Sequence, residues 1–214
     1  MKLARGTREI FDAETLLEEY IGPRRRGQRY AYPYYDALVT NGQPSVLCSG
    51  DLLAPTLLGA PVELDRMKTL TSLMPLLQRG LSALPEHATI MGAGPELLKQ
   101  VADLYDPLDD PSVEDRDVKG SLLAKVLHRK RPALIPLFDS RVRDFYRGEA
   151  AVPPAPRGER TFREYMEMLI PVIQQDLRDN AEEFGRLAQL APDDGPPLTP
   201  LRVLDIIVWM SSAI

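Results

Sequence analysis

AKVLHRKRPALIPLFDSRVRDFY, residues 124–146, predicts two helices joined by a proline-bounded apolar turn. Val126 and Leu127 continue an apolar face that begins one turn earlier, which is typical of a helix packed against a core. Pro132 should end this helix, because proline lacks an N–H group and clashes with the preceding turn. Asp139 then stands where its carboxylate can accept hydrogen bonds from the first N–H groups of a second helix. The stretch therefore predicts a helical corner.

The rest of the chain follows the same helical pattern. Apolar residues recur at helical spacing, strict alternation is almost absent, and a length of 214 residues suits one domain. We therefore expect a single, mainly α domain. Segments rich in proline, glycine or acidic residues should form the loops between its helices, near residues 22–29, 103–117, 148–160 and 191–198.

The composition excludes several kinds of site. Cys48 is the only cysteine, so an intramolecular disulfide is impossible, and a chain with only two histidines, His87 and His128, is not expected to hold a metal through them. No cofactor is predicted. The chain has no run of about 18 apolar residues, and its N-terminal residues carry charges where a secretory signal needs an apolar core. We therefore expect a cytoplasmic protein without a membrane span.

Basic side chains gather at a few places, although the net charge of −5 argues against non-specific coating of DNA. Arginines that precede closely spaced tyrosines, as in residues 24–35, can follow a phosphate backbone and stack bases; a solvated loop is the alternative. A basic run also ends the first helix of the corner, where cations suit the helix dipole. The candidate nucleic-acid-binding residues are Arg24, Arg25, Arg26, His128, Arg129, Lys130, Arg131, Arg141 and Arg143.

Three stretches resemble an uncharacterised, mainly actinobacterial family of helical proteins, a domain of unknown function. They are SGDLLAPTLLGAPV (residues 49–62), LLAKVLHRKRPALIPLFDSRV (122–142) and LRVLDIIVWM (201–210). More distantly, the middle stretch is similar to the core of the helix-hairpin-helix DNA glycosylases. That resemblance implies a glycosylase-like helical core in which Asp139 matches the catalytic aspartate. It also implies a Schiff-base lysine, for which Lys125 and Lys119 are both candidates.

The sequence departs from those glycosylases just before the first helix of the corner. Their hairpin carries two or more glycines, whereas this chain reads SVEDRDVKGS at residues 112–121, with Gly120 alone and an excess of acids. The acids would repel a phosphate that the hairpin amides are meant to bind. This departure indicates that catalysis is lost or altered.

Three functions are compatible with these patterns. The first, which we favour, is a nucleic-acid-binding protein with a glycosylase-like core and DNA as its partner. The second is a non-catalytic interaction or regulatory module with a protein partner, and the acidic residues 103–117 favour it. The third is an active base-excision glycosylase, which needs Asp139 and a lysine to face one cleft. The sequence predicts neither the substrate nor the oligomeric state.

Overall fold

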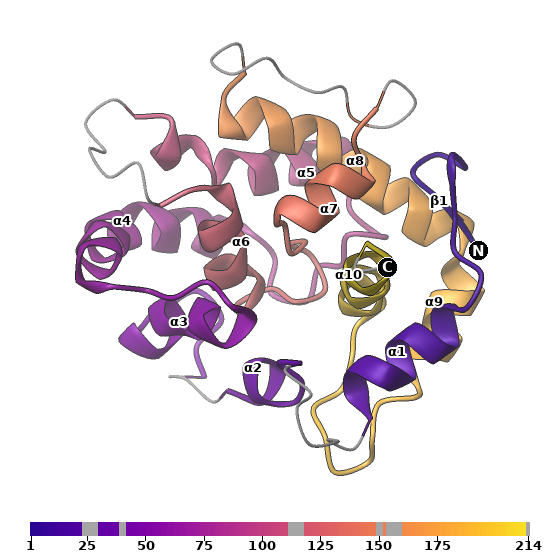
Figure 1. Cartoon of the computed structure of the whole chain (residues 1–214). Coiled ribbons are helices and arrows are strands. Elements are labelled where there is room, and N and C mark those ends of the chain that lie inside the picture. Colours follow the sequence, from indigo (N-terminus) through magenta and orange to yellow (C-terminus); the bar gives the residue numbers. More distant parts are fainter. Residues whose placement is uncertain (23–29, 39–41, 111–117, 149–151, 153–159, 213–214) are drawn as a thin grey trace.

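The computed structural model describes residues 1–22, 30–38, 42–110, 118–148, 152 and 160–212. In this part of the chain the fold is mainly helical, as predicted, with one small two-stranded sheet (Figure 1). No described helix is long and apolar enough to cross a membrane. In chain order the elements are β1 (Lys2–Leu3), β2 (Arg8–Glu9), α1 (Ala13–Ile21), α2 (Tyr34–Ala37), α3 (Ser49–Leu53), the 3₁₀ helix η1 (Ala54–Leu58), α4 (Leu64–Ala83), α5 (Pro95–Asp103), the 3₁₀ helix η2 (Asp106–Leu108), α6 (Gly120–His128), α7 (Ser140–Phe145), α8 (Phe162–Asp179), α9 (Ala181–Ala188) and α10 (Pro200–Ser211).

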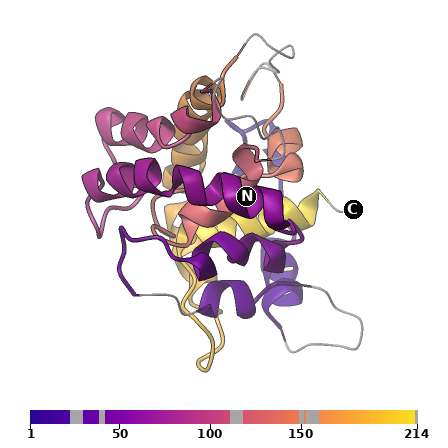
Figure 2. The same cartoon turned by 90° about the vertical axis from the view of Figure 1, so that its left-hand side faces the viewer.

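Helix α10 runs through the centre of the molecule. Every residue from Leu201 to Val208 is buried, so this part of α10 has no solvent-facing stripe, which is the pattern of a core helix. It packs against α1, α7, α8 and α9, which surround it in Figure 1. The view turned by 90° shows α10 again crossing the middle of the molecule (Figure 2). Its few polar side chains are therefore internal.

The main hydrophobic core surrounds α10 and extends to α4 and α5. Its large side chains without solvent exposure include Tyr105, Tyr146 and Phe184, which come from segments far apart in the sequence. A smaller cluster, which includes Tyr35 and Leu137, packs against the end of η1. The smaller of the two cavities described below is lined by residues from both clusters.

The predicted helical corner is confirmed as α6 and α7. Asp139 accepts hydrogen bonds through Oδ1 from the N–H groups of Arg141 (2.9 Å) and Val142 (3.0 Å), which makes it the N-cap of α7. Helix α6 is buried from Leu122 to His128. It is therefore a core helix, with no solvent-facing side in this part.

An N-terminal hairpin, β1–β2, is present that the sequence pattern does not predict. The two strands pair antiparallel, and Ala4 and Arg5 adopt left-handed φ angles of 51° and 55° in the turn. The carboxylate of Asp176 on α8 accepts hydrogen bonds from the N–H groups of these two residues, at 2.7 Å and 3.3 Å. A distant side chain thus stabilises a turn conformation that non-glycine residues rarely adopt.

The predicted loops agree with the described segments in part. Residues 191–198 contain no helix or strand, as expected. The expected loop 103–117 begins inside α5 and contains η2, and its residues 111–117 lie outside the described residues. Most of the segments near 22–29 and 148–160 also lie outside the described residues.

Candidate functional site

A cavity of about 600 Å³ lies beside the corner formed by α6 and α7. Lys119, Lys125 and Asp139, the residues that the sequence suggests for catalysis, all line it. The volume is that of an ordinary small-molecule pocket, which spans about 300–1,000 Å³. The other lining residues come mainly from η1 and the starts of α6, α7 and α8: Leu58, Gly59, Ala60, Asp109, Gly120, Ser121, Phe138, Ser140, Arg143, Arg160, Thr161, Phe162 and Tyr165.

A smaller cavity, of about 140 Å³, adjoins the larger one. Lys125, Phe138 and Asp139 line both cavities, together with Leu58 and Gly59. Two segments distant from the corner contribute the rest of its polar and aromatic lining. The end of α1 and the segment after it contribute Tyr20 and Tyr30, and α10 contributes Arg202, Asp205 and Trp209.

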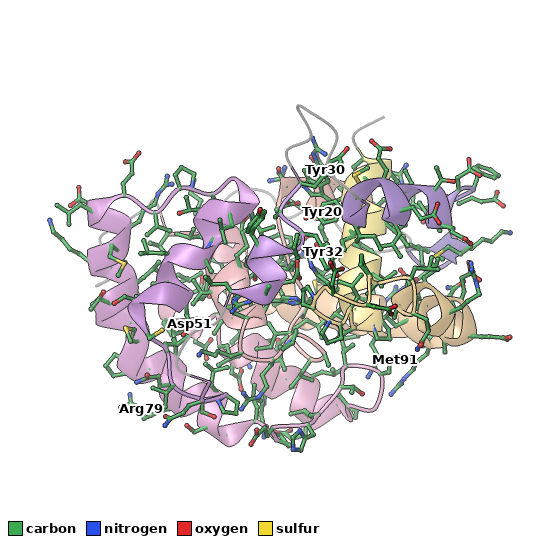
Figure 3. All side chains as sticks on the ribbon, turned by 90° about the horizontal axis from the view of Figure 1, so that it is seen from below. Tyr20, Tyr30, Tyr32, Asp51, Arg79 and Met91 are labelled. Atoms are coloured by element: carbon green, nitrogen blue, oxygen red, sulfur yellow. The ribbon has the colours of Figure 1, made fainter. Side chains whose placement is uncertain are left out.

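Three aromatic rings, those of Tyr20, Tyr30 and Trp209, form what we call the aromatic wall of the smaller cavity. The Tyr20 and Tyr30 rings stack with centroids 5.0 Å apart, and Figure 3 shows the two side by side near α10. Trp209 meets both rings at their edges, with centroid distances of 6.2 Å. The guanidinium of Arg141 lies 4.0 Å from the Trp209 ring centroid. The rings therefore support one another in a fixed arrangement.

Lys125 is an amine held inside the fold. Only 8% of the residue is exposed, and its ammonium forms no ion pair with any residue that the structure describes. Burial lowers the pKa of Lys125, and the negative charges of Asp139 and Asp205 oppose that shift. Because a buried ammonium is normally paired, this amine is poised for a ligand in either cavity.

Asp139 uses its two carboxylate oxygens differently. Oδ1 holds the cap of α7, whereas Oδ2 accepts no hydrogen bond from the described part of the chain. The side chain is partly exposed and lines both cavities. The cap therefore fixes the direction of the carboxylate, and Oδ2 remains for a ligand.

A polar pair on α10, Arg202 and Asp205, is not among the site residues predicted from the sequence. Arg202 donates hydrogen bonds to Oδ2 of Asp205, to both carboxylate oxygens of Asp36 (2.7 Å and 3.1 Å) and to the hydroxyl of Tyr20 (3.2 Å). Burial raises the pKa of Asp205 to about 6, although Arg202 lowers it, and Asp139 adds to the rise. The sequence does contain a signal for this pair: the apolar run LRVLDIIVWM carries two opposite charges three residues apart, and charged side chains are rarely fully buried unless they are paired.

The basic run at residues 128–131 is not the exposed rim that the sequence suggests. His128, Lys130 and Arg131 are buried, and only Arg129 is partly exposed. The expectation of an accessible basic surface here is wrong. Cations at a helix end produce the same sequence pattern whether they face water or the carbonyl groups of neighbouring segments.

His128 and Lys130 each have an internal partner. Nδ1 of His128 lies 2.7 Å from the carbonyl oxygen of Ile135, which holds the turn after α6. Nζ of Lys130 forms an ion pair of 2.8 Å with Asp51 on α3, a residue that Figure 3 labels. Burial lowers the pKa of His128 to about 4, so its ring is neutral at pH 7.

Arg129 and Arg131 bind backbone segments that lie nearby in space. Arg129 donates to the carbonyl of Tyr35, at the α2 helix, at 2.5 Å. Arg131 donates to the hydroxyl of Ser45 and to the carbonyl of Leu81, each at 3.1 Å. These arginines therefore join α2, α4 and the segment before α3 to the end of α6.

The remaining basic candidates differ in position. Arg143 is exposed, lines the larger cavity and pairs with Asp144 at 2.9 Å, whereas Arg141 supports the aromatic wall. Arginines 24–26 lie outside the described residues. Among the residues that are described, no group of three or more histidine, cysteine, aspartate or glutamate side chains is placed to hold a metal ion.

Comparison with known proteins provides a family and no activity. A family model described as a family of unknown function, DUF6308, matches residues 13–212. That region contains every residue that lines the two cavities. No curated protein and no solved structure matches the chain. The chain belongs to this family of unknown function, DUF6308.

Proposed function

We propose that this protein binds nucleic acid by taking one unpaired nucleotide into the double cavity around Lys125 and Asp139, on a glycosylase-like core whose catalysis is lost or altered. The observation that carries the proposal is the buried, unpaired amine of Lys125 at the junction of the two cavities. A buried charge that has no partner in the fold is unfavourable, and a ligand that supplies such a partner is therefore bound favourably.

The larger cavity suits the phosphate of such a nucleotide. Lys119, Arg143 and Arg160 line it, and they supply the cations that phosphate contacts require. Helix α6 also begins there, and no side chain caps its first N–H groups. Asp109 lines the same cavity, but its two carboxylate oxygens accept hydrogen bonds from the first N–H groups of α8, at 2.9 Å and 3.1 Å. Its negative charge is therefore partly compensated by α8.

The smaller cavity suits the ring of the base. The aromatic wall offers π faces and edges, and base–aromatic contacts of this kind are each worth about 1–3 kcal/mol in single-strand binding. Lys125, Asp139 and Asp205 contribute hydrogen-bonding groups to the same lining. An extruded base is held in this way, between apolar surfaces and groups that meet its edge.

Fluorescence anisotropy on labelled oligonucleotides tests the proposal. A single strand and a duplex with one unpaired nucleotide should bind more tightly than a fully paired duplex, and affinity should fall with rising salt. Lys125→Met should weaken binding to the first two, whereas Lys99→Met, on the exposed side of α5, should not. Equal, weak binding to all three substrates, unchanged in Lys125→Met, would contradict the proposal.

An active glycosylase is a second candidate, because Lys119, Lys125 and Asp139 face one cavity as that function requires. A lysine of lowered pKa can attack C1′ of a sugar and displace the base as the glycosidic bond breaks. Opening of the C1′–O4′ bond then gives an imine, which borohydride reduces to a stable cross-link. Trapping on duplexes that carry different damaged bases should then give a cross-link that Lys125→Met or Lys119→Met abolishes. The absence of any cross-link on these substrates would remove lysine chemistry from consideration.

The protein-interaction module has less support from the described residues. Asp103 and Asp106 pair with Arg163 on α8, at 2.6 Å and 3.4 Å, and Asp109 binds the start of the same helix. These acids from the expected acidic surface therefore serve the fold. Residues 111–117 of that surface lie outside the described residues.

A further inference from the structure

We infer that the smaller cavity selects a 4-aminopyrimidine ring, the ring of cytosine, over uracil, thymine and the purines. This inference names the base that the proposed function would select. Its extension from a free nucleotide to a nucleic-acid strand rests on the proposed function. It stands on three properties of the cavity: its volume, the carboxylate oxygens of its lining residues that accept no hydrogen bond from the described part of the chain, and the use that the fold already makes of Arg202.

The volume sets the size of the ring. A cavity of about 150 Å³ in another protein holds one benzene molecule, and the smaller cavity here measures about 140 Å³. It therefore accommodates one six-membered ring and not the fused rings of a purine. The sugar and phosphate of the same nucleotide would occupy the adjoining larger cavity, since Lys125, Phe138 and Asp139 line both.

The polar lining sets the pattern of donors and acceptors. Oδ2 of Asp139 accepts no hydrogen bond from the described residues, and only Oδ2 of Asp205 accepts one from Arg202, so each carboxylate has one oxygen left for a ligand. The exocyclic amine of cytosine carries two N–H groups, enough for both acids, and carboxylates pair with this amine in nucleic-acid recognition. The ammonium of Lys125 can donate to the ring nitrogen or the 2-carbonyl.

Uracil and thymine fit this pattern less well. Either ring has a single N–H on its pairing edge, with a carbonyl oxygen on each side of it. One carboxylate would then face a carbonyl oxygen, and two acceptors placed together in a dry cavity are unfavourable. The preference for cytosine therefore arises from two carboxylates that each need a donor.

Arg202 has little capacity left to act as a competing donor, because four of the five N–H groups of its guanidinium are already used within the fold. Its guanidinium is used by Asp36, Asp205 and the Tyr20 hydroxyl. Arg202 is 2% exposed, although it lies on the cavity lining. It is therefore a positioning residue, which orients the Asp205 carboxylate and the edge of the aromatic wall.

Trp209 provides a direct reporter, because it is the only tryptophan in the chain and lies in the lining of the smaller cavity. Its fluorescence should be followed during titration with CMP, UMP, AMP and GMP, and with oligothymidylate that contains one central cytosine or none. We expect CMP to bind at least about tenfold more tightly than UMP. The strand with one cytosine should exceed the strand without cytosine by a similar factor.

The two titrations separate the inference from the proposed function. Preference for CMP without binding of either strand would support the aminopyrimidine site and remove the nucleic-acid function. Binding of both strands with no preference for cytosine would support the nucleic-acid function and remove the aminopyrimidine site. Equal affinity for CMP and UMP, or tighter binding of a purine nucleotide, would overturn the inference.

Asp139→Asn is the sharpest variant. Asparagine caps a helix about as well as aspartate, so α7 should remain folded, while the group facing the cavity changes from an acceptor to an amide donor. The tenfold preference for CMP should vanish or turn toward UMP, whose carbonyl oxygen the new amide can bind. Asp205→Asn should act in the same direction, with thermal unfolding as a check on the fold. Asp65→Asn, an exposed acid on α4, is the matched control. Full retention of the CMP preference in both cavity variants would exclude this assignment.

Discussion

Lys125 is placed where it opposes folding. Moving an ammonium out of water is unfavourable, and in the described structure no ion pair compensates for it. The lowered pKa expresses the same fact, because it means that the folded state binds the proton of Lys125 less tightly than the unfolded chain does. Residues that weaken the fold in this way are characteristic of functional sites.

We therefore predict that Lys125→Met does not destabilise the protein at pH 7 and raises its melting temperature, since methionine retains the apolar stem without the charge. The gain should shrink as the pH rises toward 10.5, the ordinary pKa of lysine, because the folded wild type loses this proton before the unfolded chain does. Thermal unfolding of both proteins between pH 7 and pH 10 measures the effect. A loss of stability at pH 7 would show that the amine has a structural role.

His128 makes stability sensitive to acid. Its pKa is about 4 in the fold and 6.5 in an unfolded chain, so between these values the unfolded chain binds more protons. Stability should therefore fall as the pH decreases from 6.5 to 4, by about 3 kcal/mol in all. His128→Asn should remove this part of the pH dependence, and His87→Asn, at an exposed position, should leave it unchanged. Urea unfolding at several pH values tests both; equal slopes in wild type and His128→Asn would contradict the prediction.

The start of helix α6 has no room for a side chain at Gly120. A Cβ atom at Gly120 would lie 2.9 Å from Cδ1 of Phe162, the first residue of α8. Gly120→Ala should therefore destabilise the fold by about 1–3 kcal/mol, as overpacking does. Gly185→Ala, where α9 has open space for a methyl group, should instead stabilise by up to about 1 kcal/mol. Denaturant unfolding of the two variants should give shifts of opposite sign.

The elements also show what the sequence could predict. The corner of α6 and α7 was predictable, because Pro132 and Asp139 act within one turn of their own position. The hairpin β1–β2 was not, since its turn depends on Asp176, more than 170 residues away. Asp139 and Lys125 were candidates through the resemblance to the glycosylases, whereas the position of Asp205 beside them depends on how α10 packs against the corner. Helical spacing reports which residues share a face, and it does not report which distant helix that face meets.

Buried ion pairs connect helices of this molecule that are remote in sequence. Lys130 at the end of α6 and Asp51 on α3 are both almost fully buried, at 2.8 Å. We predict that Lys130→Met destabilises the protein by about 3–5 kcal/mol, because Asp51 is then left as an uncompensated buried charge. Lys68→Met removes an exposed pair with Asp65 and should cost no more than about 1 kcal/mol. Comparable effects of the two substitutions in urea unfolding would refute this distinction.

The central position of α10 has a consequence for the order of events during synthesis. Arg202 bonds to Asp36, a residue made 166 positions earlier, and α10 supplies Asp205 and Trp209 to the smaller cavity. Domains begin to form while the ribosome is still adding residues, at about 5–20 per second. Until α10 leaves the ribosome, the surrounding helices lack the helix against which they pack, and Asp36 lacks the guanidinium of Arg202 as its partner. The nascent chain must therefore wait for α10 before this interior and the smaller cavity are complete.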